Sequence, residues 1–167
     1  MLLGSFVHDP DLDLTAPTLQ RTSVRGVLFR DDRLLLLASR HGDYKFPGGG
    51  VEARESIPAA LQREFLEECG LPGVEIGLAI GITTEYLRAI EPEYEVFKQT
   101  SHYFYCTSDS EFGEPELEGY EAELELEPRW VTVSEALAAN RAVRAGGVGV
   151  MRWLDREIQV LSHLADL

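Results

Sequence analysis

The stretch that decides how this sequence is interpreted is FPGGGVEARESIPAALQREFLEECGL, residues 46–71. It begins with three consecutive glycines and continues into a segment with the features of a helix. Ser56 is a favoured N-cap residue, Pro58 is tolerated in the first turn, and Gly70 suits the C-terminal end. We therefore predict a glycine loop followed by a helix that starts near Ser56 and stops at Gly70.

The predicted helix carries an acidic face. At 100° per residue, Glu67 and Glu68 project within about 60° of Glu64, and Arg63 lies at the edge of the same face. Glu64 and Glu68 form an (i, i+4) pair of like charges, which costs a few tenths of a kcal/mol in a helix. Because local stability does not account for this pair, we expect a functional reason. Mg²⁺ prefers oxygen ligands from one or two carboxylates and substrate phosphates.

Size and charge limit what the chain can do. Its 167 residues fit one domain, which we place at residues 21–167 after an acidic N-terminal arm at 1–20. A formal net charge of −14 argues against duplex nucleic acid and anionic membranes as partners. A phosphorylated small molecule fits only where local cations or a bound divalent metal reverse the field.

The compartment expected from the sequence is the cytoplasm. Cys69 and Cys106 show no metal-ligand spacing and are too few for a disulfide framework. No apolar run approaches the roughly 20 residues of a membrane span. The first residues also lack the basic segment and long apolar stretch of a secretory signal. We therefore expect a reduced cytoplasmic protein with no membrane partner.

Patterns along the rest of the chain predict an α+β or α/β fold with a central mixed β-sheet, of which we favour α+β. A hairpin that turns at Asp31-Asp32 is expected early in the domain. The predicted strands cover about residues 22–30, 33–39, 74–89 and 97–107. The predicted C-terminal helices cover about 134–144 and 150–164. An acidic loop, residues 108–120, precedes the segments EAELEL and RWVTV.

The pattern around the predicted helix resembles the Nudix box, G-x5-E-x7-R-E-U-x-E-E-x-G-U, in which U is a bulky apolar residue. The matching residues are Gly49, Glu55, Arg63, Glu64, Phe65, Glu67, Glu68, Gly70 and Leu71. A chain of average composition would match every fixed position with a probability on the order of one in ten million. The flanking strand order is also similar to the Nudix fold, an α/β/α sandwich.

The resemblance implies a metal-dependent hydrolase. Nudix proteins mostly cleave a pyrophosphate bond in a nucleoside diphosphate linked to another group, with Mg²⁺ or Mn²⁺ as cofactor. By position, the implied metal ligands are Glu64, Glu67 and Glu68 with the carbonyl oxygen of Gly49. The implied partner is a small nucleoside diphosphate or polyphosphate derivative.

Two further roles follow from the resemblance. Arg63 and Glu55 are expected to form a buried ion pair that fixes the glycine loop against the helix. The general base is either a glutamate of the box or a distal one, for which we predict Glu121 or Glu123.

Substrate contacts are predicted from the scarcity of positive charge. Candidate phosphate-binding residues are Arg40, His41, Lys45, Arg88 and Lys98. We expect Arg40 and Lys45 to bind substrate, together with Tyr86, which resembles a tyrosine of the dinucleoside polyphosphate hydrolases. His102 is expected to be a sheet residue rather than a catalytic base.

Several alternatives remain open from the sequence. One is a Nudix domain that senses a nucleotide sugar without cleaving it, although the intact glutamates argue against such a module. Another is an isopentenyl diphosphate isomerase, whose catalytic cysteine context is not evident around Cys69 or Cys106. The sequence does not distinguish a monomer from a homodimer. It also leaves open whether the substrate is a dinucleoside polyphosphate, ADP-ribose, a nucleotide sugar or an oxidised nucleotide.

Overall fold

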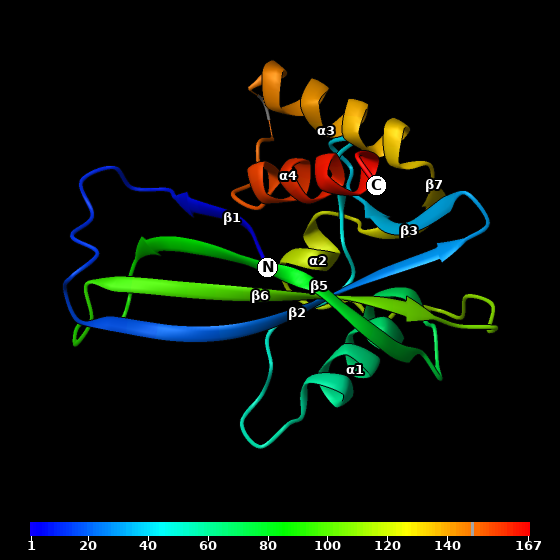
Figure 1. The fold of residues 1–167 in the computed structure, drawn as a ribbon, viewed down its shortest axis with the longest axis horizontal. Coiled ribbons are helices and arrows are strands. Elements are labelled where there is room, and N and C mark those ends of the chain that lie inside the picture. Colours follow the sequence, from blue (N-terminus) through cyan, green and yellow to red (C-terminus); the bar gives the residue numbers. More distant parts are fainter. Residues whose placement is uncertain (148) are drawn as a thin grey trace.

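The computed structural model describes residues 1–147 and 149–167 (Figure 1). The strands are β1 Leu2–Val7, β2 Thr18–Arg30, β3 Arg33–Ala38, β4 Tyr44–Lys45, β5 Glu75–Arg88, β6 Val96–Thr107 and β7 Glu127–Val131. The helices are α1 Ile57–Cys69, α2 Tyr120–Glu123, α3 Val133–Gly146 and α4 Leu154–Ala165.

These strands form one mixed sheet in the order β1-β5-β6-β2-β3-β4, with β7 paired to β3. Two pairings are parallel, β1 with β5 and β2 with β6, and the others are antiparallel. Helix α1 lies on one side of the sheet, and α3 and α4 lie together on the other (Figure 1). The predicted sandwich of helices around a central mixed sheet is confirmed.

Helix α1 forms where its caps predict it. The Ser56 side chain accepts a hydrogen bond from the backbone N–H of Ala59, and a proline occupies the first turn. Gly70 ends the helix in the left-handed conformation with φ 59°, and its N–H donates to the carbonyl oxygens of the last turn. Glycine adopts this φ without a steric penalty. Local sequence chemistry therefore fixes both ends of the helix that carries the acidic face.

A hydrophobic cluster lies on each face of the sheet. On the α1 side, Phe65 packs against Val24 and Leu28 of β2. Gly26 lets the helix come close, because a Cβ at that position would lie 2.3 Å from the Phe65 ring. On the other side, Val27 and Phe46 join residues of α3 and α4 in the second cluster. Alternate residues of β2 thus face opposite cores, as expected for a buried strand.

Several boundaries differ from the prediction. Strand β2 begins at Thr18 instead of 22, because its parallel pairing with β6 extends to the Thr18–Val96 pair. Helix α4 begins at Leu154 instead of 150. Within the first 20 residues, β1 pairs with β5 of the main sheet. The division of the chain at residue 20 stays a prediction. Among the described residues, no helix combines the length and hydropathy needed to cross a lipid bilayer.

Candidate active site

The glycine loop runs along the edge of β2 that β3 leaves uncovered. Backbone N–H groups of Val24 and Gly26 donate to the carbonyl oxygens of Gly49 and Pro47, each at 2.9 Å. Gly48 has φ 134°, and a Cβ at that position would lie 2.0 Å from the Val24 carbonyl oxygen. Only glycine fits there, because both the φ and the space exclude a side chain. The loop is therefore held in place as an extension of the sheet.

The fixed loop binds the carboxylate of Glu68. One oxygen of Glu68 accepts a hydrogen bond of 2.6 Å from the Gly48 N–H, and the other lies 2.8 Å from the Nζ atom of Lys45. The Glu68 side chain is fully buried, and that of Lys45 is 2% exposed. Since a buried carboxylate needs charged or hydrogen-bonding partners, these contacts hold Glu68 in one position.

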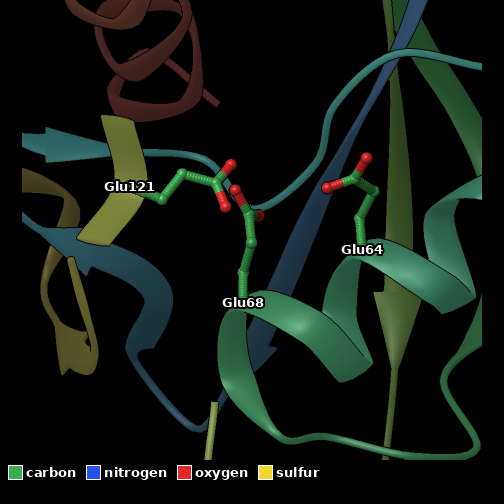
Figure 2. Close-up of side chains that lie close together, drawn as sticks. All are labelled: Glu64, Glu68 and Glu121. Atoms are coloured by element: carbon green, nitrogen blue, oxygen red, sulfur yellow. The ribbon is translucent and has the colours of Figure 1, made fainter. Parts of the chain in front are cut away.

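Three carboxylates converge beside the loop (Figure 2). Glu64 and Glu68 extend from α1, and Glu121 extends toward them from α2. One carboxylate oxygen from each lies within 4.8 Å of the others. Burial raises the pKa of Glu64, and the charge of Glu68 raises it further, although the hydrogen bond from Arg63 opposes both. We call these three residues the acidic cluster. Its oxygen donors match those that Mg²⁺ and Mn²⁺ prefer.

Lys45 changes the electrostatics expected from the sequence. Its Nζ atom lies 3.9 Å from a carboxylate oxygen of Glu121 as well as 2.8 Å from Glu68. Glu68 still raises the pKa of Glu64, so the expected repulsion between the two carboxylates is present, but Lys45 also attracts Glu68. The helical projection could not include a lysine that β4 brings to the helix from 23 residues away.

Arg63 connects the loop to the helix. Its guanidinium donates to both carboxylate oxygens of Glu55, at 2.9 and 3.0 Å, and to the carbonyl oxygen of Gly50 at 3.0 Å. The hydrogen bond from Arg63 lowers the pKa of Glu55, and the hydrogen bond to Glu55 raises the pKa of Arg63. The side chains of Arg63 and Glu55 are 26% and 15% exposed. The expected pair is present, but it is only partly buried, because solvent reaches both side chains.

Two of the predicted glutamates lie outside the acidic cluster. The Glu67 side chain is 42% exposed, and its carboxylate lies 3.2 Å from Arg63. Glu123 is exposed, although it belongs to the same short helix as Glu121. Their roles remain predictions from the resemblance.

A pocket of about 280 Å³ lies between the sheet and α4, on the face opposite α1. Arg25, Lys45, Phe97, Met151 and Trp153 are among the residues that line it, and we call it the α4 pocket. It is joined to the acidic cluster through Lys45, which lines the pocket and binds Glu68. The same lysine lies 5.9 Å from the centre of the Trp153 ring.

A buried ionic network supports this pocket. Arg156 of α4 binds Glu85 of β5 at 2.6 Å and Glu157 at 2.5 Å. Glu157 also accepts a hydrogen bond from the Phe46 N–H at 3.0 Å, just before the glycine loop. Burial opposes the charged form of Arg156, but the surrounding acidic groups, Glu157 first, raise its pKa above the ordinary value. The network ties α4 to β5 and to the start of the loop.

Comparison with known proteins identifies the family. Residues 19–154 match the family model of the NUDIX domain. The chain belongs to the Nudix family. It is 31% identical over 108 residues to "Nudix hydrolase 12, mitochondrial" from Arabidopsis thaliana, covering 65% of this chain and 51% of that protein. It is 40% identical over 70 residues to an RNA pyrophosphohydrolase from Halorhodospira halophila, covering 41% of this chain and 38% of that protein. The chain thus spans about half or less of the length of these relatives.

Solved Nudix-type structures show the same fold. The E. coli dihydroneopterin triphosphate pyrophosphohydrolase superposes with a TM-score of 0.54 at 17% identity, covering 83% of this chain and 91% of that one. The MutT protein of Methanosarcina mazei superposes with a TM-score of 0.52 at 21% identity, covering 87% and 98%. At these identities the likeness concerns the fold alone.

The three residues predicted to bind substrate in this Nudix chain do not lie in one place. Lys45 lines the α4 pocket, as a substrate contact would. Arg40 is exposed and borders a different hollow. Tyr86 lies between Glu85 and Leu87, which both line the pocket, so its side chain faces the other side of the sheet. There it lies beneath Lys98.

The other predicted phosphate contacts lie elsewhere. Arg88 is exposed and paired with Asp9, and His41 is only partly buried and lies next to Gly149. Sequence reasoning did not single out Arg25, Glu85 or Trp153. Each is a single residue without a local motif, and only the pairing of distant strands and the docking of α4 bring them together.

Proposed function

We propose that this Nudix chain is a hydrolase that requires Mg²⁺ or Mn²⁺ and cleaves a pyrophosphate bond in a small nucleoside diphosphate or polyphosphate derivative. The observation that carries the proposal is the convergence of Glu64, Glu68 and Glu121 within 4.8 Å. Lys45 and Arg63 both contact the cluster, but Arg63 is shared with Glu55 and Glu67. These two cations do not neutralise three carboxylates, so the cluster favours a further cation. The neighbouring α4 pocket supplies room for an organic group.

The residues present fit a divalent metal. Glu64, Glu68 and Glu121 would hold it, with the Gly49 carbonyl as the further oxygen that the resemblance implies. That carbonyl already accepts one hydrogen bond from Val24, and its second lone pair remains for a ligand. A Cβ on Gly49 would lie 2.3 Å from a carboxylate oxygen of Glu64, so glycine keeps this space clear. When bound, such a metal neutralises the pyrophosphate and lowers the pKa of a coordinated water.

Different side chains of the site would bind phosphate, position the loop and accept a proton. Lys45, between the acidic cluster and the pocket, would bind phosphate oxygens and orient the scissile bond. Arg63 would hold the loop and Glu64 in register through its contacts with Glu55 and Gly50. Of the two distal glutamates, Glu121 lies in the cluster and is 19% exposed, which favours it over Glu123 as the acceptor of the proton from water.

A substrate panel tests this proposal. ADP-ribose, dinucleoside polyphosphates, nucleotide sugars and oxidised dGTP would each be incubated with the protein, with Mg²⁺ or with EDTA, and the products separated by chromatography. We expect cleavage at a pyrophosphate bond of at least one compound, and only with metal. Tight binding of a nucleotide sugar without any cleavage would instead support the non-catalytic sensing domain.

A further inference from the structure

Arg25 is a buried cation without an acidic partner. The residue is 6% exposed, and among residues 1–147 and 149–167 no carboxylate lies within salt-bridge distance of its guanidinium. Its Nη1 atom donates to the carbonyl oxygen of Gly48, while its Nε atom is buried and finds no hydrogen-bond partner among the residues that the structure describes. Leaving a charge buried and unpaired is costly, particularly in a chain with a net charge of −14. An anion is therefore expected beside Arg25.

Three more polar groups near Arg25 are buried and make no hydrogen bond of standard geometry within the described part of the chain. They are the hydroxyl groups of Thr83, Ser101 and Tyr103, although those of Thr83 and Tyr103 lie close enough to interact. Arg25 pairs with Tyr103 across β2 and β6, and Thr83 pairs with Ser101 across β5 and β6. Residues directly opposite each other share a face of the sheet, as do alternate residues of one strand. All four groups therefore lie on the α4 side, where unused hydrogen-bonding capacity calls for an explanation.

Arg25 also stands between two parts of the site. It lines the α4 pocket and binds the loop at Gly48, whose N–H donates to Glu68 of the acidic cluster. Burial and Glu68 raise the pKa of Glu64, and the positive charge of Arg25 is among the influences that lower it. An anion at Arg25 would consequently be a close neighbour of a group held at the cluster.

The rest of the pocket suits an aromatic ring. Phe97 comes from β6, and Met151 and Trp153 come from the segment that leads into α4. The volume of about 280 Å³ lies just below the range of roughly 300–1,000 Å³ that is typical of small-molecule sites. The pocket therefore has room for one nucleoside-sized group and not for two.

We propose that Arg25 is an oxyanion-binding residue that holds the 5′-phosphate of a single nucleotide, whose nucleoside lies among Phe97, Met151 and Trp153. This inference rests on the proposed function, because it places the pyrophosphate bond between Arg25 and the acidic cluster. It restricts the substrate to one nucleotide inside the pocket, with the second linked group outside. A guanidinium suits this task because its planar donors match phosphate oxygens.

The Nε–H group of Arg25 gives a direct test in metal-free protein. Its ¹H–¹⁵N NMR signal would be assigned from the signal that disappears in Arg25→Lys, and inorganic phosphate would then be titrated into wild type with EDTA present. We expect a saturable shift of this signal with phosphate and none with sodium chloride at the same ionic strength. A signal that does not move with phosphate, or that moves equally with chloride, would overturn the proposal.

Binding of AMP adds a second readout. In a Trp130→Phe background, fluorescence reports on Trp153 in the pocket, because Trp130 lies elsewhere, stacked on Phe112. With EDTA present, Arg25→Met should weaken AMP binding at least tenfold. Arg25→Lys should weaken it less, since lysine keeps the positive charge but loses the paired N–H donors of the guanidinium. Arg129→Met, an exposed arginine outside the pocket, should leave the affinity unchanged. Unchanged AMP affinity in folded Arg25→Lys and Arg25→Met would reject the assignment.

These measurements separate the inference from the proposed function. They involve no metal and no turnover, so phosphate binding at Arg25 stands even if the substrate panel shows no cleavage. The converse result is metal-dependent cleavage by a protein whose Arg25 Nε–H signal does not shift with phosphate. That result would support the proposed hydrolase activity and overturn the oxyanion site at Arg25.

Discussion

Lys45 and Glu68 form a buried ion pair in which Nζ lies 2.8 Å from a carboxylate oxygen. The lysine comes from the short strand β4 and the glutamate from the last turn of α1. Since Lys45 also lies 3.9 Å from Glu121, one ammonium group faces two members of the acidic cluster. Lys45 thus supplies positive charge to the cluster before any metal binds.

This position makes the stability of the metal-free protein depend on Lys45. In EDTA, Lys45→Met should lower the free energy of unfolding by about 3–5 kcal/mol, because Glu68 is left buried without its cation. Added Mg²⁺ should stabilise the variant more than the wild type, because a divalent ion then compensates a more negative site. Urea denaturation with and without Mg²⁺ measures both effects. Lys98→Met replaces the other lysine of the chain, and an equal loss in that control would refute the role given to Lys45.

Arg63→Ala should destabilise the protein less than the loss of a fully buried pair. Its side chain is 26% exposed, so solvent screens part of its attraction to Glu55. Hydrogen bonds to charged groups are worth about 1.5–3 kcal/mol, and we expect a loss at the lower end of that range. Chemical denaturation checks this value against Arg129→Ala, whose side chain is 59% exposed. A loss no greater than in Arg129→Ala would mean that Arg63 does not brace the loop.

The depressed pKa of Glu55 predicts a specific pH dependence. Its carboxylate is stabilised in the folded state, so its contribution is fully present above the ordinary value of 4.5 and is lost as pH falls through the lowered folded pKa. The stability difference between wild type and Glu55→Gln should therefore shrink as the solution is acidified below that value. Denaturation curves collected from about pH 3 to pH 6 would reveal this trend. A difference that is constant or grows with acid would contradict the Arg63–Glu55 assignment.

Glu121 and Glu123 form a matched pair for testing the site. They lie two residues apart on α2, but Glu121 points into the acidic cluster (Figure 2) and Glu123 is exposed. Glu121→Gln should reduce kcat by about 10²–10³-fold, as when a group that stabilises the transition state is removed. Glu123→Gln should retain nearly full activity. If steady-state kinetics show the larger loss for Glu123→Gln, the distal carboxylate has been assigned to the wrong residue.

The helix and its acidic face could be predicted because both depend on local chemistry. Ser56 and Gly70 act through their own backbone positions, and the spacing of Glu64 and Glu68 follows from helical periodicity. The choice between Glu121 and Glu123 could not be made, because a four-residue helix leaves no periodic signal in an acidic segment.

The α4 pocket depended on contacts that no local pattern encodes. Strand alternation implies that Glu85 and Tyr86 face opposite sides of the sheet, but it does not say which side receives α4. Tyr86 therefore faces away from this pocket, and its role as a substrate contact stays a prediction. The sequence around Arg25 likewise shows only an arginine in a predicted strand. Its position opposite Tyr103 depends on the parallel pairing of β2 with β6, which no local pattern predicts.

The most direct test of a metal-dependent hydrolase is the Mg²⁺ dependence of turnover, measured on the best substrate of the panel, for wild type and Glu68→Gln. Both proteins would be assayed well below their unfolding temperatures, because Glu68 also partners Lys45. We predict that wild-type turnover disappears in EDTA and returns with Mg²⁺, and that Glu68→Gln is at least about a hundredfold slower at saturating Mg²⁺. Full wild-type turnover in EDTA, or a wild-type rate in folded Glu68→Gln, would contradict the assignment of the acidic cluster as the metal-dependent active site.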